Sequence, residues 1–599
     1  MKRLLPILLS ILLLCGCGAP AATEPVVIAT QPVQPPQEAP VIPETPEIPY
    51  ESRFSSETTI TLSNDGVKSA GPNSMNVFSS NDIIYYEDKD TYASGNPYGE
   101  GKDADKHTAE EATKHTVVNI TAPGAYRVTG QLSYGQIRID LGDNAYDDKS
   151  AVVELILDNA DITCTVAPAI LFMNVYECDG NWSEDTASAD VDTSAAGANL
   201  ILNGKNTVTG AYVAKIFKDK DGEKKLWKQD GAIYSYMSMN VYGPGALTLN
   251  ADNEGMDTEL HLTINGGDIT ILSGNDGINT NEDNVSVTTI NAGTVHIVAG
   301  LGEEGDGIDS NGYLVINGGT VISAAKPVSD SGLDSDRGSY IHGGMVIAFG
   351  AAMDWAETES SQVTMNLQFS QRQKGALQVT TEDGAEVFSF NPATDPVLKD
   401  YDRGFQGAVI SAPSFKIGDS YLVYSNGAQM QYFSTDVMRG PGGFGGQMPG
   451  GKGQRPEGME LPEGFDGKMP AWGEGEMPSM PEGFQGGQRP EGFQGGERPD
   501  GFGKGSNRGD RDKDRQPPEG FEGQMPNGEM PAWPEGEIPE GFEGFKGEMP
   551  EGFNGQRPEG FGGNFPGGFG GQGNASGEGQ TVFYMQDKVN FFSGLTAIQ

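Results

Sequence analysis

A repeat of about 26 residues runs through residues 253–350 of this chain. Each copy joins an acidic Gly motif to a Gly-containing turn, which is followed by a run of β-branched residues. The turns lie 26, 26 and 25 residues apart and begin at Asn265, Asn291, Asn317 and His342. A constant period of this length indicates a solenoid, because one unit is too small to bury its own apolar face and must stack on its neighbours.

The residues around each turn are strand formers in short runs without helical spacing. The aliphatic residues before the turns are Ile264, Ile290, Ile316 and Ile341, and those after the turns are Ile269, Val295, Val321 and Val346. In stacked repeats, equivalent positions lie about 4.8 Å apart, so these side chains would form aliphatic ladders in a narrow core. The pattern predicts an all-β fold, a parallel β-helix with about 22 to 26 residues and three short strands per coil. An antiparallel β-sandwich is the alternative.

The acidic motifs, at residues 254–257, 276–279, 306–309 and 331–334, recur at the same place in each repeat. Carboxylates stacked about 4.8 Å apart would repel by roughly 3 to 4 kcal/mol per pair at an effective dielectric constant of about 20. Cations would remove this repulsion, and irregular sets of carboxylate, amide and carbonyl oxygens suit Ca²⁺ better than Mg²⁺. The predicted calcium ligands are Asp257, Asp276, Asn279, Asp306, Asp309, Asp330, Asp334 and Asp336, with Glu254 and Glu259 as further candidates. Alternatively, Asn and Asp are only corner residues that cap the strand ends.

The N-terminus has the pattern of an exported bacterial lipoprotein. Two basic residues and an apolar stretch over residues 4–14 predict a secretory signal peptide. The next residues resemble a lipobox with cleavage before Cys17, whose lipidation would anchor the mature protein to the cell membrane, facing the extracellular side. We therefore expect a signal peptide and lipobox over 1–17 and a stiff Pro-rich tether over 18–50. A soluble secreted protein is the alternative.

Residues 51–438 are predicted to form a single β-helix domain with a C-terminal cap. Upstream of the clear repeats, alternating strands that end in Asn, Asp or Gly have the pattern of the first coils. Insertions are expected at about 179–198 and 214–229. Further strands between residues 363 and 424 lack the acidic motif, and they would cover the end of the solenoid, whose unpaired edge would otherwise promote aggregation.

The segment 439–580 consists of variants of Pro-Glu-Gly-Phe. Its composition offers too little apolar surface to offset the entropy of the chain, so the sequence predicts a disordered tail. The tail would be a flexible spacer, or its spaced aromatic residues, such as Trp472 and Trp533, would contact polysaccharide or other chains. After it, residues 581–599 alternate as a short strand-like segment that could fold back on the main domain.

Cysteine and histidine usage gives no indication of a zinc site. After removal of the signal peptide and lipidation of Cys17, the mature chain would retain Cys164 and Cys178. An exported domain permits a disulfide between them, but a buried reduced pair is equally compatible with the sequence. The chain has no Cys-x-x-Cys pair, and its 5 His residues are scattered singly.

The charge of the chain argues against nucleic acid as a partner and raises an objection to acidic polysaccharide. With 84 acidic against 39 basic residues, the formal net charge is −45, and no basic stripe is present, which argues against nucleic-acid binding. An acidic polysaccharide would be repelled by the same charge. Calcium bound to the protein carboxylates could bridge them to sugar carboxylates and so remove this objection.

Several motifs in order resemble the bacterial carbohydrate-binding domain family. They are Gly-x-Tyr-x-x-Thr-Gly-x-Leu-x-x-Gly-Gln-Ile-x-Ile-Asp at 124–140, Ala-Ile-Tyr-Ser at 232–235, and the repeated Asp-Gly-Ile-(Asp/Asn) and Asn-Gly-Gly motifs. The resemblance covers about residues 55–430, and this chain departs from the pattern in its long insertions and in Ser331, which replaces an acidic residue. It implies a right-handed parallel β-helix similar to pectate lyases, with bound calcium and affinity for acidic plant polysaccharide such as polygalacturonate, and also for cellulose.

Catalysis is the first alternative to binding. A β-eliminating lyase needs a base near the calcium ions, and Lys326, which lies near Asp330 in the sequence, is the one credible candidate. A glycoside hydrolase would use two carboxylates, but the many acidic residues prevent the choice of a pair. A second alternative is a structural or adhesion protein that acts through the Phe- and Gly-rich tail. The favoured hypothesis is a calcium-dependent, non-catalytic protein that binds acidic polysaccharide at the bacterial cell surface.

Overall fold

The computed structural model describes residues 48–86, 103–220, 223–302, 304–327, 329–351, 354–435 and 579–598. In these ranges the chain is nearly all β-structure, with α1 (Ala109–Ala112) as the one short α-helix, so the predicted all-β class is confirmed. No helix in the described part is long and apolar enough to cross a membrane. The predicted lipidation site Cys17, most of the tether and almost all of the tail over 439–580 lie outside the described residues.

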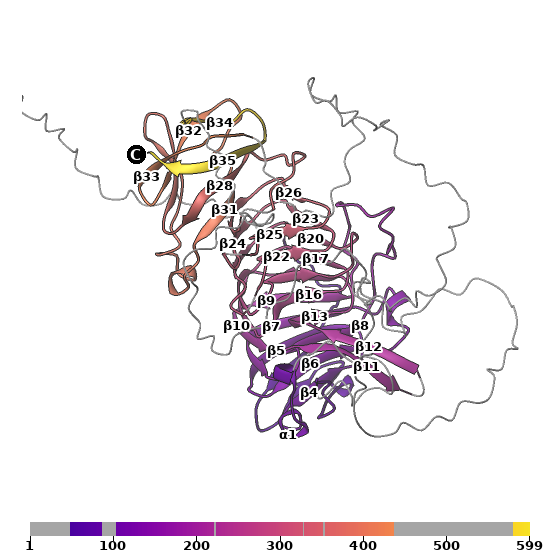
Figure 1. Cartoon of the computed structure of the whole chain (residues 1–599). Coiled ribbons are helices and arrows are strands. Elements are labelled where there is room, and N and C mark those ends of the chain that lie inside the picture. The colour runs from indigo at the N-terminus through magenta and orange to yellow at the C-terminus, as the bar shows by residue number, and fades with distance from the viewer. Residues whose placement is uncertain are drawn as a thin grey trace, which may run out of the picture. The chain divides into compact units, whose positions relative to one another are not determined.

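Each repeat contributes one strand to each of three parallel ladders (Figure 1). The first ladder contains β13 (Gly231–Ser235), β16 (Glu254–Thr258), β19 (Ile278–Thr280), β22 (Ile308–Ser310) and β25 (Leu333–Ser335). The second contains β14 (Met239–Tyr242), β17 (His261–Ile264), β20 (Val287–Ile290), β23 (Tyr313–Ile316) and β26 (Ser339–Ile341). The third contains β15 (Ala246–Ala251), β18 (Asp268–Ser273), β21 (Thr294–Val298), β24 (Thr320–Ala324) and β27 (Met345–Gly350).

Earlier strands continue these ladders toward the N-terminus. The first ladder extends through β8 (Ile170–Asn174), β6 (Gly135–Asp140) and β4 (Thr116–Ile120) to an antiparallel edge strand, β3 (Val77–Ser80). The other two ladders extend through β9 (Ala198–Asn203), β10 (Lys205–Gly210), β7 (Val153–Cys164), β5 (Gly124–Leu132) and β1 (Glu57–Leu62), which pairs with β2 (Lys68–Ala70). The upstream strands are therefore rungs of the same ladders.

The aliphatic ladders predicted from the repeat are confirmed by the strand register. Ile264, Ile290, Ile316 and Ile341 occupy paired positions, and so do Ile269, Val295, Val321 and Val346. All eight side chains are buried. The turn between these two rows has positive φ at its last Gly in every repeat, at Gly267, Gly293, Gly319 and Gly344. Only Gly adopts that conformation without strain, which explains the repeated Gly of the turn.

Two insertions interrupt the ladders where the sequence predicted them. Residues 175–197 connect β8 to β9 without a strand of their own. The second insertion is an antiparallel hairpin of β11 (Val213–Lys220) and β12 (Glu223–Gln229). Residues 189–194 of the first insertion border a groove on the second ladder.

Antiparallel strands replace the parallel ladders beyond β27. They are β28 (Thr364–Gln373), β29 (Leu377–Thr381), β30 (Glu386–Phe390), β31 (Phe405–Ser411), β32 (Ser420–Ser425) and β33 (Ala428–Gln431). β31 pairs antiparallel with β27 and so joins this part to the third ladder. Two C-terminal strands, β34 (Phe583–Tyr584) and β35 (Val589–Ala597), complete it, because β34 pairs with β32 and β35 pairs with β28. The segment after residue 580 therefore folds back, as its alternation suggested (Figure 1).

Cys164 and Cys178 are both free thiols in the structure, the first buried and the second partly exposed. Cys164 is buried, and burial raises its pKa to about 12. Because only the thiolate is a strong nucleophile or metal ligand, Cys164 is a packing residue.

Candidate functional site

Two rows of polar side chains run along the first ladder. One row is in register on paired strand positions and contains Tyr234, Asp257, Asn279, Asp309 and Asp334. The other row contains the first residue of each motif, namely Glu254, Asp276, Asp306 and Ser331. After each of the first three, the amide of the following Gly donates to the backbone carbonyl of the next row member. The repeat thus brings acidic residues from four successive rungs together, and we refer to these two rows as the carboxylate cluster.

Backbone amides fix the orientation of the carboxylates in the second row. Asp276 Oδ1 accepts a hydrogen bond from the amide of Asp306 at 2.6 Å. Asp306 Oδ1 accepts in the same way from the amide of Ser331 at 2.5 Å. Asp330 lies beside the cluster, and its Oδ2 accepts from the amide of Gly305 at 2.9 Å. Each of these bonds uses one oxygen, so each carboxylate is held in place with a second oxygen available for another interaction.

The cluster concentrates negative charge where water has little access. Asp276 is only 8% exposed, and burial followed by the charge of Glu254 raises its pKa well above the usual range. Burial and the charge of Asp334 raise the pKa of Asp306 to about 9. Burial also raises the pKa of Asp334. The protein alone therefore disfavours full ionisation of the cluster, and a bound cation would reverse that preference.

The geometry at the buried end fits a calcium ion. One carboxylate oxygen each from Asp230, Glu254 and Asp257 lies within 4.8 Å of the others. Two oxygens that each bind calcium at about 2.4 Å can lie at most about 4.8 Å apart, so the three could share one ion. On the next rung, Asn279 is 6% exposed, and its Oδ1 has no hydrogen-bond partner among the described residues. A buried carbonyl oxygen without a donor is costly unless it binds a cation.

The opposite end of the cluster is more accessible. Asp306, Asp309 and Asp334 are partly exposed, and Asp336 lies at the surface. Partial burial and the neighbouring Asp334 raise the pKa of Asp336 to about 6. The predicted ligands therefore form a gradient from buried to accessible positions, and a ligand from solution could reach only the accessible end.

Comparisons with known proteins find similarity to a carbohydrate-binding domain family over part of the chain. Residues 114–386 match the sequence profile of a family described as "Carbohydrate-binding domain-containing protein". A protein of that description from Acetivibrio thermocellus is 28% identical over 155 residues, which are 26% of this chain and 44% of the relative, so less than half of the relative's length is matched. This segment is similar to carbohydrate-binding domains. A solved structure, described as a polysaccharide lyase-like protein from C. thermocellum in a gadolinium derivative, has a TM-score of 0.29 and 23% identity, and covers 48% of this chain and 93% of its own.

The matched residues include all the predicted metal ligands. Two acidic residues that the sequence analysis missed extend the carboxylate cluster, one at each end. Asp230 belongs to the buried end, and the signal for it was the pair Asp230-Gly231, which repeats the acidic Gly motif one rung earlier. Asp354 belongs to the accessible end, where Ser331 Oγ donates to its Oδ2 at 3.3 Å. Burial and the charge of Asp334 raise the pKa of Asp354 to about 7. Asp354 thus supplies a carboxylate where Ser331 interrupts the acidic row.

The candidate lyase base has a different environment from the carboxylates. Lys326 Nζ donates a hydrogen bond to the backbone carbonyl of Gly302 at 2.7 Å. Its own carbonyl accepts from the amide of Asp330 at 3.2 Å. The side chain of Lys326 thus contacts the loop that carries Gly302.

Glu259, a further candidate ligand, accepts a hydrogen bond from the hydroxyl of Tyr234.

Proposed function

We propose that this protein binds acidic polysaccharide in a calcium-dependent manner at a bacterial cell surface. Its ladders would form a right-handed parallel β-helix, and lipidated Cys17 would anchor it to the membrane. The similarity of residues 114–386 to carbohydrate-binding domains supports the polysaccharide class. The observation that carries the calcium dependence is the carboxylate cluster, with its elevated pKa values and the orphaned oxygen of Asn279.

In this proposal the two ends of the cluster have different tasks. The buried residues Glu254, Asp257 and Asn279, together with the partly buried Asp230, would hold a structural ion, because a polymer has little access to them. The accessible carboxylates of Asp306, Asp309 and Asp334 would hold ions that face solution. Calcium bound there would supply the positive charge that a uronate carboxylate needs, since the chain itself has a net charge of −45.

Calorimetric titration of the full-length protein with polygalacturonate, with calcium and then with chelator, tests this function. We expect binding heat only with calcium, and no rise in the ultraviolet absorbance of unsaturated uronate products. The triple substitution Asp276→Asn, Asp306→Asn and Asp309→Asn should abolish binding and remove the calcium-induced rise in melting temperature. Lys326→Ala should change neither.

A charge-matched variant provides the control. Asp65→Asn, Asp268→Asn and Asp383→Asn remove three exposed carboxylates outside the cluster and should leave binding intact. Unchanged binding in the cluster variant would contradict the proposed site. Product formation that disappears in Lys326→Ala would make the protein a lyase instead.

A further inference from the structure

A groove of about 700 Å³ lies on the second ladder, away from the carboxylate cluster. Its floor is formed by outward-facing residues of successive rungs, and one wall is formed by residues 189–194 of the first insertion. Tyr242 lies toward one end and Tyr340 toward the other, and both rings are partly exposed. No residue of this groove belongs to the predicted calcium ligands.

The floor consists of two in-register rows of side chains, and the second row is a ladder of Asn amides. Thr263, Thr289, Val315 and Tyr340 occupy paired positions along the ladder. Beside them, Asn291 Nδ2 donates to Asn265 Oδ1 at 2.8 Å, and Asn317 Nδ2 donates to Asn291 Oδ1 at 2.9 Å. In the described residues, each of these two amide nitrogens uses one of its two N–H groups in this way, which leaves the second one for a ligand.

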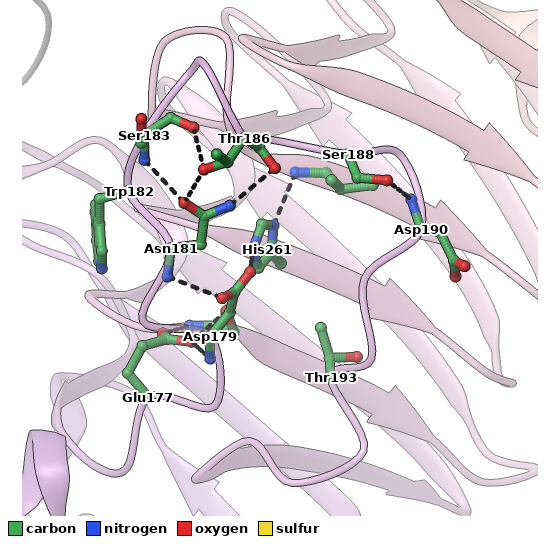
Figure 2. A network of polar contacts seen from close by, with 12 residues as sticks. Glu177, Asp179, Asn181, Trp182, Ser183, Thr186, Ser188, Asp190, Thr193 and His261 are labelled. Atoms are coloured by element: carbon green, nitrogen blue, oxygen red, sulfur yellow. Dashed lines mark hydrogen bonds and ion pairs between the residues drawn. The ribbon is translucent and has the colours of Figure 1, made fainter.

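The insertion that carries the wall is fixed at two points, and Figure 2 shows the first of them. Near its start, the carboxylate of Asp179 lies 3.3 Å from His261 Nε2, while His261 Nδ1 accepts from the amide of Val287 at 3.0 Å. Near its other end, Thr193 Oγ1 lies 2.7 Å from both Asn240 Oδ1 and Thr263 Oγ1. A wall fixed in this way makes the groove preformed, so little entropy is lost when a ligand binds.

The charges of the groove determine which ligand it can accept. Its lining includes the carboxylates of Asp190, Asp192 and Glu359 but no Lys or Arg. Arg53 lies against the wall, where its guanidinium donates to the backbone carbonyl of Ser194. The three carboxylates outnumber it, so a polyanion would still meet net repulsion there. Regularly spaced amides and hydroxyls flanked by aromatic rings instead match an uncharged chain of repeating, hydroxyl-bearing units.

We propose that this groove is a second carbohydrate site, which binds an uncharged polysaccharide chain along Asn291 and Asn317 without the help of calcium. The ring of Tyr340 would pack against a sugar face, and the Asn amides would bond the sugar hydroxyls. The ring of Tyr242 packs against Tyr50, with centroids 4.6 Å apart, and closes the other end of the groove. This inference rests on the polysaccharide-binding function proposed above and assigns a separate ligand class to a separate face.

The test is titration of the full-length protein, in chelator, with neutral oligosaccharides of glucose, xylose, mannose and galactose. We expect at least one of these probes to bind and the double variant Asn317→Ala, Tyr340→Ala to weaken that binding at least tenfold. Calcium-dependent binding of polygalacturonate by the same variant should be unchanged, which also shows that it is folded. Tyr134→Ala removes a similarly exposed tyrosine outside the groove and serves as the matched control.

The outcomes separate this inference from the proposed function. Polygalacturonate binding without any binding of neutral sugars would overturn the second site and leave the proposed function standing, whereas no binding of either class would overturn both. Loss of polygalacturonate binding in a folded groove variant would make the groove the acidic site, against this inference. Binding of neutral sugars only after deletion of residues 18–47 would mean that the N-terminal segment occupies the groove in the intact protein, which also overturns it.

Discussion

Asp306 has a strongly raised pKa within the carboxylate cluster. One of its oxygens is bound by the amide of Ser331, yet burial and the charge of Asp334 still raise its pKa to about 9. The hydrogen bond to the charged form is therefore outweighed by desolvation and like-charge repulsion. The ionisation of Asp306 should therefore depend on whether the cluster holds a cation.

The stability of the calcium-free protein should fall as pH rises. Because the folded-state pKa of Asp306 is about 9 and its ordinary value is 3.8, its contribution to stability is full below about pH 4 and is lost as pH rises toward 9. Thermal unfolding in chelator should therefore show a lower melting temperature at about pH 8 than at about pH 5. Calcium should reverse the trend, since its ligands must be deprotonated.

Asp306→Asn isolates this contribution from those of other titrating groups. The amide cannot ionise, so the variant in chelator should lose part of the pH dependence and be more stable than the wild type at about pH 8. An identical pH dependence in the two proteins would show that Asp306 is not ionising as its surroundings require.

The sequence predicted the acidic residues on the repeating rungs but missed those that extend the cluster at its ends. The repeat placed Asp257, Asn279 and Asp309 on successive rungs, and the strand register confirms that placement. Asp354 could not be found in this way, because it lies outside the period and reaches Ser331 only through the fold. Side chains from irregular connections carry no periodic signal, and the groove was missed for the same reason, since its wall is an insertion.

At the scale of the elements, two kinds of Gly maintain the ladders. The turn glycines adopt positive φ. The glycines of the acidic motifs do not, but they allow successive rungs to approach closely. A Cβ on Gly277 would lie 2.2 Å from Ile297 Cγ2 and 2.5 Å from the carbonyl oxygen of Gly307. Ile297 is fully buried and Gly307 is part of the next rung, so neither can move cheaply.

Gly277→Ala should therefore destabilise the protein by about 1 to 3 kcal/mol through overpacking. Because the displaced rung carries Asp306 and Asp309, calcium affinity should also fall. Gly180→Ala is the matched control, since a Cβ there meets no heavy atom within 4 Å and its backbone φ is unstrained. Denaturant unfolding with and without calcium measures both effects, and equal stability of the two variants would argue against close packing of the rungs.

At the scale of the whole molecule, the residues on either side of the low-complexity segment pair with each other. Tyr432 and Gln580 exchange backbone hydrogen bonds of 2.9 and 2.8 Å, which bring the two ends of that segment together. Beyond it, Phe583, Phe592 and Leu595 are buried among the antiparallel strands. The sequence showed the alternation of this last segment but could not identify its partner, because a pairing across such a distance leaves no local pattern.

A chain that ends at residue 438 should consequently be less stable than the full-length protein. It lacks β35, whose loss leaves one edge of β28 unpaired and exposes the apolar surface that Phe592 and Leu595 cover. We expect a lower melting temperature, binding of a hydrophobic dye and concentration-dependent aggregation. Replacing residues 439–578 by a short Gly/Ser linker retains β34 and β35 and should preserve stability or raise it by at most about 2 kcal/mol, since a shorter loop costs less entropy to close. If the chain ending at 438 melted at the same temperature as the linker variant, β34 and β35 would contribute nothing to the stability of the protein, against this prediction.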